Sequence, residues 1–372
     1  MGPRLGGGAV PVGRRNLLAD RRRLTISVGG VAAAIALILL LQGLWSGFQV
    51  QISAYEDNVG ADLFVGEPGT ANFLGVPSVL PLETARAIRA VPGVERADPI
   101  AVRFAVLDLH DRKVFMFLVG SRPEGMGGPW DLAAGKPARA DDEVVMDETV
   151  ADQHGIALGD RVEVMGELFK VVGLSTDTRS WMAGFVFTTH HAIERLLRMP
   201  GTTSYILVRA ADSEAVAGSI RDQTGLAVLT PQRLGDNDRA LLGRIMNGAI
   251  GLMLVIAFAA GTLIIALTVY SAIVERLREY GIAKAMGARG ARLFRIVLGQ
   301  TLTLSALGTL AGYVLFRGAS WLVVMVRPQF WVRVSWTGVA GALLAAGLMA
   351  FLAAVVPTRR ITRLDPASVY RG

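Results

Sequence analysis

The sequence predicts an α-helical membrane domain of four transmembrane helices, with an inserted extracytoplasmic α/β domain. Three observations support this prediction: four long stretches without a charge, clusters of arginine at their ends, and an acidic, β-rich segment between the first two stretches. The composition agrees, because hydrophobic residues make up 52% of the 372 residues and the mean hydropathy is +0.44. Ordinary soluble domains are less apolar than this.

The four charge-free stretches define the predicted transmembrane helices. A helix needs about 20 apolar residues to cross about 30 Å of hydrocarbon, and each stretch is at least that long. The first two hold 32 and 30 residues, which is about 45 Å of helix, so we expect them to continue beyond the bilayer as a paired stalk. The stretches are Leu24–Tyr55, Ile245–Val274, Ile296–Phe316 and Val334–Thr358.

These stretches divide the chain into predicted membrane and soluble segments. The soluble segments are a basic cytoplasmic N-terminus (1–23), the extracytoplasmic α/β domain (56–240), a cytoplasmic coupling loop (275–295), an extracytoplasmic loop (317–333) and a cytoplasmic C-terminus (359–372). The membrane segments are 24–55 and 241–274, which both include stalk, followed by 296–316 and 334–358.

A cleaved signal peptide is the alternative interpretation of the N-terminus. Arg21–Arg23 form a basic segment, and Ile52–Ala54 loosely resembles a cleavage site. However, the apolar run Leu24–Leu41 is longer than the about 7–15 residues of a signal-peptide core. The sequence therefore favours an uncleaved membrane anchor.

The placement of basic residues sets the predicted topology. Six arginines precede the first helix, six basic residues lie between the second and third helices, and four arginines follow the fourth helix. Cytoplasmic segments of membrane proteins carry such an excess of positive charge. Both termini and the loop around Lys284 are therefore predicted to be cytoplasmic, in a multi-pass membrane protein.

The charge of the α/β segment differs from that of the rest of the chain. Segment 56–240 has 27 acidic and 18 basic residues, a net charge of −9, whereas the remainder has a net charge of +16. The basic charge thus sits at membrane edges, where anionic lipids attract it. We expect membrane lipids, and not nucleic acid, as partners of these residues.

Segment 56–240 has the pattern of a folded α/β domain. Runs of β-branched and aromatic residues predict eight strands, and helical patterns between them predict four helices. A Gly- and Pro-rich stretch, 124–140, is predicted to be a loop between subdomains. The strands are Asp62–Val65, Ile100–Leu109, Lys113–Val119, Glu143–Met146, Arg161–Val164, Phe169–Leu174, Phe185–Thr188 and Tyr205–Val208, and the helices are Leu82–Ala90, Glu148–His154, His191–Met199 and Glu214–Thr224.

The sequence lacks the residue patterns of common catalytic and metal sites. It has no cysteine, no phosphate-binding loop, no G-x-S-x-G elbow and no H-E-x-x-H motif. His190 and His191 are adjacent, and adjacent side chains point apart, which disfavours a metal site there. We therefore expect no catalytic residue and no cofactor, which argues against a membrane-anchored enzyme. Because the membrane stretches hold no charged relay either, a partner must supply the energy for any transport.

Two pairs of glycines have the spacing of close helix contacts. Gly43 and Gly47, and likewise Gly308 and Gly312, lie four residues apart on one helix face. Small residues at this spacing let helix backbones approach each other in a membrane. Packing within the chain and dimerisation explain the pattern equally well.

The predicted cytoplasmic loop contains a short helix with exposed apolar residues. After a charged turn, Ile282 and Met286 lie on one side of this helix, and Gly287 can end it because glycine tolerates φ > 0. A solvated hairpin is the alternative. Apolar side chains exposed in a cytoplasmic loop are costly unless they dock against a partner.

The loop and the C-terminus resemble those of a known family. The run Glu275–Ala288, of the form E-R-x-R-E-x-G-I-x-K-A-x-G-A, is similar to the loop after the second helix in the MacB/FtsX-like permeases of ABC transporters. Pro357–Ile361, followed by Leu364–Ala367, resembles the C-terminal pattern of these proteins, and Asp142–Leu174 resembles part of their outer domain. MacB itself carries a fused ATPase domain that is absent here, and the layout is closer to DevC-like or small haem-exporter permeases.

The resemblance implies a permease subunit of the bacterial inner membrane, which a separate ABC ATPase drives by pushing on a coupling helix at about Gly281–Ala288. It also implies a second permease chain, which is either an identical copy or a paralogue, and a periplasmic adaptor as a further candidate partner. The implied activity is export or extraction of a lipophilic or peptide-like substrate by mechanotransmission. An FtsX-like scaffold that regulates a cell-wall hydrolase without transport is the alternative. The residues expected to couple to the ATPase are Arg276, Glu279, Gly281, Ile282, Lys284, Met286 and Gly287.

Overall fold

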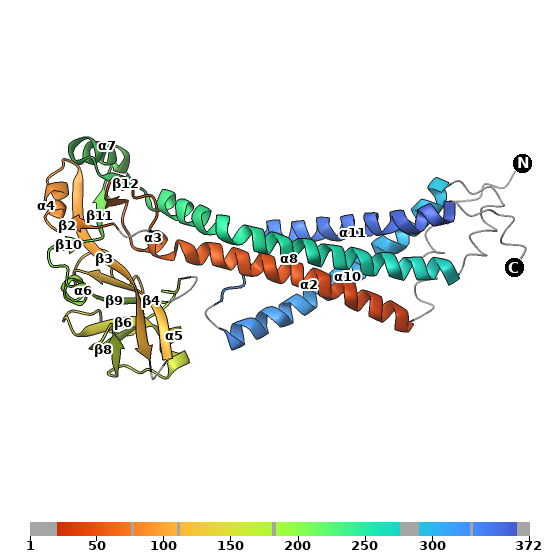
Figure 1. Ribbon diagram of the computed structural model, residues 1–372, viewed down its shortest axis with the longest axis horizontal. Helices are drawn as coiled ribbons and strands as arrows, with labels where there is room; N and C mark the ends of the chain where they lie inside the picture. The colour runs from red at the N-terminus through yellow and green to blue at the C-terminus, as the bar shows by residue number, and fades with distance from the viewer. Residues whose placement is uncertain are drawn as a thin grey trace, which may run out of the picture. The chain divides into compact units, whose positions relative to one another are not determined.

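The structure, a computed structural model, describes residues 21–75, 78–109, 112–180, 184–275, 290–327 and 330–362 (Figure 1). These residues form two compact units. The helical unit draws on Met1–Gly47, Met246–Arg327 and Trp331–Gly372, and the α/β unit draws on Phe48–Ile245 and Pro328–Phe330.

Four long helices dominate the described chain outside the sheet: α2 (Arg21–Ile52), α8 (Pro231–Glu275), α10 (Gly290–Val326) and α11 (Trp336–Thr362). Each is long and apolar enough to cross a membrane, and a helix satisfies its own backbone groups, as hydrocarbon requires. The predicted membrane domain of four helices is confirmed. Helix α10 runs on to Val326, so residues 317–326, which were predicted as loop, continue that helix.

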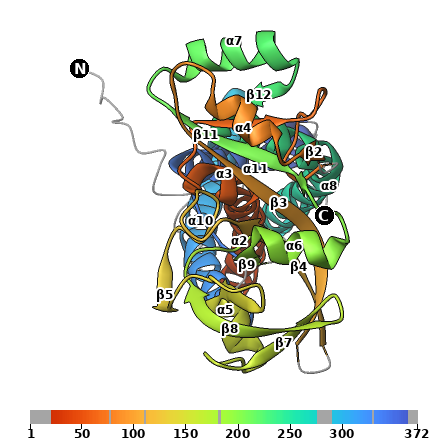
Figure 2. The same ribbon diagram turned by 90° about the vertical axis from the view of Figure 1, so that its left-hand side faces the viewer.

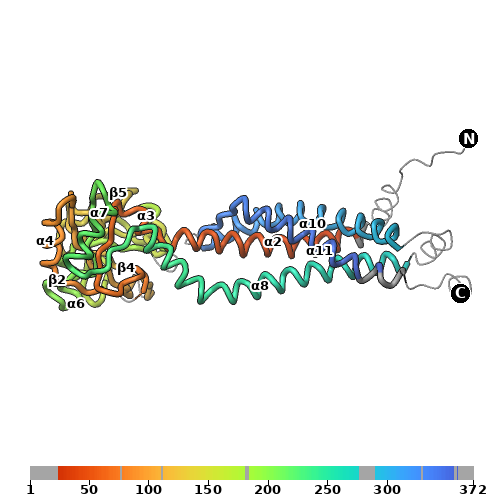
Figure 3. The backbone as a smooth tube through the Cα atoms, turned by 90° about the horizontal axis from the view of Figure 1, so that it is seen from above, coloured from red at the N-terminus to blue at the C-terminus, as the bar shows by residue number. Residues whose placement is uncertain are grey.

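Helix α2 contacts the other three helices of the helical unit. Ser27 and Thr268 share a hydrogen bond of 2.7 Å between α2 and α8. Figure 3 shows α2 beside α10 and α11. The buried core between these helices contains Val31 and Ile35 of α2, among others. The other fully or nearly fully buried members include Ile265, Val269, Val297, Leu304, Ala342 and Met349.

A mixed ten-stranded sheet forms the α/β unit. Its strands are β1 (Leu63–Gly66), β3 (Val94–Leu109), β4 (Arg112–Ser121), β5 (Leu132–Gly135), β6 (Glu143–Asp147), β7 (Arg161–Val164), β8 (Glu167–Ser175), β9 (Phe185–Thr189), β11 (Tyr205–Ala210) and β12 (Ala227–Leu229). The strand order is β12-β1-β11-β3-β4-β9-β6-β8-β5, and β7 pairs with β3 and β8. A separate ladder joins β2 (Leu80–Pro81) to β10 (Thr202–Thr203).

The long strand β3 connects two halves of the sheet. Its first part pairs with β11, and its second part, from Ala101 to Leu109, pairs with β4. Helices α4 (Thr84–Arg89) and α7 (Ser213–Thr224) pack on the first half, whereas α5 (Glu148–His154) and α6 (His190–Leu197) pack on the second. Figure 2 shows α4 and α7 at one end of the unit and α5 at the other.

Local capping explains where these short helices begin and end. The Asp147 side chain accepts a hydrogen bond from the backbone N–H of Thr149 at the start of α5, and Gly155, with φ of 65°, ends that helix. Asp212 and Gly225 have the same roles for α7. The eight predicted strands and four predicted helices are all confirmed, with boundaries within two residues, except that β3 begins at Val94 and not at Ile100. The sequence did not predict β2, β5, β10, β12 or the short helix α3 (Ala54–Asn58), and β5 lies within the stretch that was predicted as a loop.

Candidate functional site

The predicted coupling residues lie outside the described part of the chain, in the segment 276–289. These residues are Arg276, Glu279, Gly281, Ile282, Lys284, Met286 and Gly287. The structure does describe a cluster of polar and charged side chains at the helix ends that belong to the α/β unit. There the end of α2, helix α3 and the start of α8 meet inside the α/β unit, and we call Ser53, Glu56, Asp57, Asp238 and Arg239 the joint.

Arg239 of α8 ties that helix to α2 and α3. Its Nε donates to the Gln49 carbonyl oxygen at 3.2 Å, and its Nη2 donates to Ser53 Oγ. The same Nη2 lies 3.4 Å from Asp57 Oδ2, and Ser53 Oγ donates to that carboxylate at 2.7 Å. One guanidinium therefore links α8 to a backbone oxygen, a hydroxyl and a carboxylate of the facing helices.

A glycine lets the two helices come close enough for these bonds. A Cβ atom at Gly235 would lie 2.8 Å from Ser53 Cβ, closer than two carbon atoms can pack. Because α8 carries no side chain at this position, its backbone can lie directly against Ser53. The close approach places Arg239, one helical turn further along α8, within reach of Asp57.

The two residues of α8 that precede Arg239 hold a loop of the α/β unit. The Asp238 carboxylate accepts hydrogen bonds from the backbone N–H groups of Phe73 and Leu74, at 2.8 and 3.1 Å. Asn237 Nδ2 donates to the Ala71 carbonyl oxygen at 2.8 Å. The side chain of Asp238 is completely buried, so these bonds bind the start of α8 to the interior of the domain.

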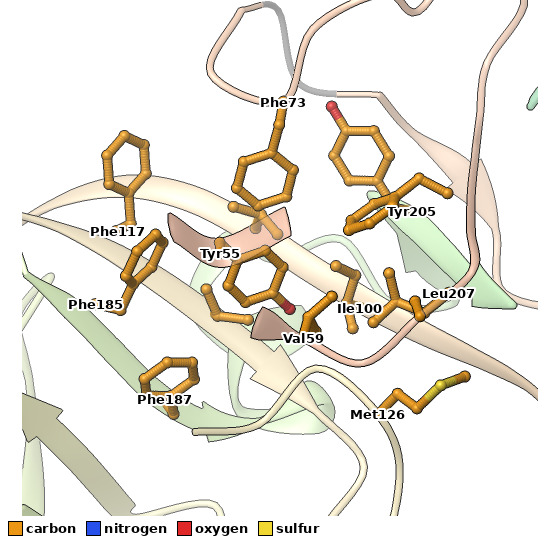
Figure 4. Close-up of a cluster of buried hydrophobic side chains, with 14 of the residues drawn as sticks. Tyr55, Val59, Phe73, Ile100, Phe117, Met126, Phe185, Phe187, Tyr205 and Leu207 are labelled. Atoms are coloured by element: carbon orange, nitrogen blue, oxygen red, sulfur yellow. The ribbon is translucent and has the colours of Figure 1, made fainter. Parts of the chain in front are cut away.

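Aromatic rings hold the same loop from its other side (Figure 4). The ring of Tyr55, from α3, stacks on Phe73 with centroids 4.9 Å apart and an interplanar angle of 14°. Phe73 also stacks on Tyr205 of β11 at 5.5 Å. The Tyr55 hydroxyl donates to the Gly127 carbonyl oxygen at 3.0 Å. The loop is thus fixed between α8 and α3.

Glu56 is the unusual charge-bearing group of the joint. Its side chain is buried, and neither carboxylate oxygen has a hydrogen-bond donor among the described residues. Glu56 lies outside the charge-free stretch that ends at Tyr55. Burial raises the pKa of the Glu56 carboxyl well above its usual range, and the neighbouring carboxylate of Asp238 raises it further. Both causes favour the protonated form of the Glu56 carboxyl.

The two glycine pairs lie against different neighbours. A Cβ at Gly308 would lie 2.4 Å from Val31 Cγ1, and one at Gly312 would lie 2.8 Å from the Ala32 carbonyl oxygen, so this pair lies against helix α2. A Cβ at Gly47 would lie 1.8 Å from the Trp331 carbonyl oxygen.

The backbone N–H of Arg333 also donates to the Gly43 carbonyl oxygen at 3.0 Å. The Gly43 and Gly47 pair thus accommodates the chain segment that precedes α11, and not another helix. Removing a Cβ allows any backbone to approach, and the sequence does not say which one.

The adjacent histidines contact separate partners. His191 Nδ1 lies 2.6 Å from Asp141 Oδ2, whereas the buried His190 has Nδ1 3.9 Å from Glu194 Oε1. Within the described ranges, no group of three or more His, Cys, Asp or Glu side chains could hold a metal ion.

Sequence reasoning did not identify the joint. The signal was available, because Glu56 and Asp57 directly follow the first charge-free stretch and Asp238 and Arg239 shortly precede the second. Charged residues at the ends of two predicted stalk helices are candidates for contact with each other. What the sequence alone did not indicate is that the carboxyl groups of Glu56 and Asp238 are both buried.

Comparison with known proteins identifies the family. The sequence model of the MacB-like periplasmic core domain matches residues 24–223, and that of the FtsX-like permease C-terminal domain matches residues 251–366. An uncharacterized ABC transporter permease of Mycobacterium tuberculosis (strain ATCC 25618 / H37Rv) is 26% identical over 364 residues, which cover 96% of this chain and 98% of the relative.

Two further proteins match this chain with lower sequence identity. The pyoverdine export ATP-binding/permease protein PvdT of Pseudomonas fluorescens (strain Pf0-1) is 22% identical over 402 residues, which cover 97% of this chain and 58% of PvdT. A crystal structure of the periplasmic region of MacB from Actinobacillus actinomycetemcomitans also matches. The matched part is 50% of this chain and 94% of the MacB chain, with 13% identity and a TM-score of 0.38. The two domain matches follow each other in sequence order, and the described residues include four helices that are long and apolar enough to cross a membrane. The chain therefore belongs to the MacB/FtsX-like family of ABC transporter permeases, multi-pass membrane proteins whose work requires an ATPase partner.

Proposed function

We propose that this chain couples ATP hydrolysis in a separate ATPase subunit to movement of its α/β domain, and so exports or extracts a lipophilic or peptide-like substrate. In this proposal the α/β domain lies outside the cell membrane, and both termini and the segment 276–289 lie inside. The arginine distribution supports this topology. Two permease chains pair with two ATPase subunits, because each chain has one predicted coupling loop.

Helix α8 is the observation that carries the proposal. It is one helix of 45 residues from Pro231 to Glu275, which corresponds to about 68 Å. Its first turns hold the joint through Asp238 and Arg239, and its last residue, Glu275, is the first residue of the predicted coupling loop. A continuous helix of this kind can carry a displacement from the ATPase to the α/β domain.

The membrane helices support an external energy source. The stretches 245–274 and 296–316 contain no Asp, Glu, Lys or Arg, and transporters driven by ion gradients usually place ionisable relays at membrane depth. One relative is an export protein by name, PvdT, which joins ATP-binding and permease functions. Both facts favour ATP-driven export over transport that is coupled to a gradient.

Transport in a defined system tests the proposal. Proteoliposomes that contain the permease and its ATPase are loaded with ATP or ADP, and albumin outside accepts a fluorescent phospholipid or a fluorescent hydrophobic peptide. We expect faster transfer of at least one probe with ATP than with ADP. ATPase activity that depends on the permease but moves neither probe would favour the signalling scaffold. A permease that binds no ABC ATPase would contradict both functions.

A further inference from the structure

A groove with a volume of about 440 Å³ lies within the helical unit. This is within the range of about 300–1,000 Å³ that is common for ligand sites. Helices α2, α10 and α11 all contribute to its walls, which are almost entirely apolar. The lining residues are Leu39 of α2, Leu302, Ser305, Ala306, Thr309, Leu310 and Tyr313 of α10, and Val339, Ala342, Leu343, Ala346 and Gly347 of α11.

The groove runs along the helix axes. Its α10 residues recur every three or four positions from Leu302 to Tyr313, which is the spacing of one helix face. This stripe is about 16 Å long at 1.5 Å per residue. One leaflet of a bilayer, half of a hydrocarbon core of about 30 Å, is about as thick. The groove therefore has the length of one acyl chain that stands upright in a leaflet.

The hydroxyl groups of the lining differ in whether the protein already hydrogen-bonds them. Ser305 Oγ donates to the Ala346 carbonyl oxygen, and Thr309 Oγ1 donates to the Ser305 carbonyl oxygen, both at 2.8 Å. Among the described residues, none hydrogen-bonds the hydroxyl of Tyr313, which is exposed at one end of the groove. Arg317, also exposed, follows one helical turn later and marks the end of the charge-free stretch.

The same end of the groove has further features of a membrane interface. Trp336, the first residue of α11, is 90% exposed and lies one turn before Val339 of the lining. Tryptophan and tyrosine are enriched at the headgroup level of membranes, and arginine there attracts anionic headgroups. The apolar stripe and the basic residue at its end match an anionic lipid.

We propose that this groove binds one acyl chain of an anionic membrane lipid, with the lipid headgroup at Tyr313 and Arg317. On the topology of the proposed function, on which this step rests, the lipid belongs to the outer leaflet. The groove then identifies an acyl lipid as the class of substrate that the permease takes from the membrane.

A photoreactive lipid tests the proposal in the full chain. The permease is reconstituted in phosphatidylcholine nanodiscs that contain phosphatidylglycerol with a diazirine in the middle of one acyl chain. We expect saturable cross-links at groove residues such as Leu302, Ala306 and Leu343, located by peptide mass spectrometry. Cross-links spread over all four helices in proportion to their exposure, without saturation, would overturn the proposal.

Two glycine-to-phenylalanine variants, one inside the groove and one outside it, test whether filling the groove blocks labelling. A Cβ at Gly347 meets no atom within 4 Å, so Gly347→Phe places a ring in the groove without a backbone clash. Gly299 of α10 is equally open but does not line the groove. We expect Gly347→Phe to lower labelling by about tenfold, because the site is overpacked, and Gly299→Phe to leave it unchanged. Equal labelling in the two variants would contradict the site.

The headgroup is tested separately. The wild-type chain should be labelled several-fold more by the phosphatidylglycerol probe than by a phosphatidylcholine probe, and Arg317→Gln should remove this preference. Arg295→Gln, at the opposite end of α10, should keep it. A preference that survives Arg317→Gln would contradict the headgroup assignment. Labelling needs no ATPase, so failure of lipid binding and failure of ATP coupling give different results.

Discussion

The carboxyl groups of Glu56 and Asp238 interact in the interior of the α/β unit, although 182 positions separate them in the sequence. Glu56 comes from α3 and Asp238 from the start of α8, so the pair lies where two long helices enter the domain. Asp238 is held by two backbone N–H groups, whereas neither carboxyl oxygen of Glu56 has a hydrogen-bond partner within the described part of the chain. A second negative charge beside Asp238 is costly in the protein interior, and this raises the pKa of Glu56 further.

The first prediction concerns the pH dependence of stability. The pKa of Glu56 lies well above its usual range in the folded chain, so the folded chain retains the Glu56 proton to a higher pH than the unfolded chain, which loses it around pH 4.3. The folded state then binds more protons, so the free energy of unfolding falls as pH rises toward the raised pKa of Glu56, by at most about 1.4 kcal/mol per pH unit. Glu56→Gln has no proton to lose and should flatten this slope, which thermal unfolding from about pH 5 to about pH 9 would measure.

The charges around Glu56 define the controls for this experiment. Asp57 and Asp238 both favour the protonated form of Glu56, and Arg239 contacts Asp57. Glu163 is exposed on strand β7, so Glu163→Gln should leave the pH profile as in the wild type. Identical slopes for the wild type and Glu56→Gln would show that Glu56 does not carry this proton.

The second prediction concerns Arg239. Arg239→Met keeps the apolar stem but removes every bond to Gln49, Ser53 and Asp57. Hydrogen bonds to charged groups contribute about 1.5–3 kcal/mol when buried, and this partly exposed site should lose about 1–2 kcal/mol of stability. We also expect ATP hydrolysis to continue with less transport. Arg233→Met, exposed on the same helix, is the control, and equal transport in both variants would contradict a role for Arg239 in the joint.

How much of this structure the sequence could predict depends on whether the cause is local. The absence of charge from Ile245 to Val274 predicts a membrane helix, because hydrocarbon excludes ions whatever the rest of the chain does. Helix α5 is predictable for a similar reason, since the Asp147 cap and Gly155 lie within a few residues of it. The short strands β2, β10 and β12 hold two or three residues each, too few to show an alternating pattern.

Contacts between distant residues could not be predicted in this way. Two opposite halves of β3 pair with different strands, and no local pattern selects them. The Gly43 pair and the Gly308 pair have the same spacing in the sequence, yet one accepts a chain segment and the other a helix. Spacing predicts that a backbone can approach closely, but only the tertiary fold determines which backbone does.

The third prediction concerns the contact of α10 with α2. Gly308→Val would force atoms into the space of Val31, whose Cγ1 lies 2.4 Å from the position of the new Cβ. Overpacking of this kind costs about 1–3 kcal/mol. Gly299→Val, on the same helix but in open space, should change stability much less. Thermal unfolding of the two variants in detergent measures the difference, and equal stability would show that the Gly308 contact is not tight.

The fourth prediction concerns topology. The chain has no cysteine, so Glu163→Cys and Arg289→Cys each introduce a single reactive thiol. If the α/β domain lies outside and the predicted coupling loop inside, a membrane-impermeant maleimide should label the first variant in intact cells, and the second only after lysis. Labelling of the second variant alone in intact cells would reverse the proposed topology.

The last prediction concerns the coupling loop. If Ile282 and Met286 enter an apolar groove of the ATPase, truncating both should weaken its association by at least about tenfold, because buried anchors at interfaces commonly contribute about 1–3 kcal/mol each. Gly287→Val should act differently, since a β-branched residue resists φ > 0 and would displace the end of the helix.

Co-purification and affinity measurement with the ATPase separate these two effects. The Ile282→Ala, Met286→Ala double variant should lose binding, whereas Gly287→Val should keep partial binding with hydrolysis that no longer drives transport. Arg221→Ala, exposed on α7 of the α/β unit, is the control and should behave as the wild type. A solvated hairpin predicts that all of these variants are nearly silent. Wild-type binding and transport in the double-alanine variant would therefore remove the coupling helix, and with it the proposed route from ATP to the α/β domain.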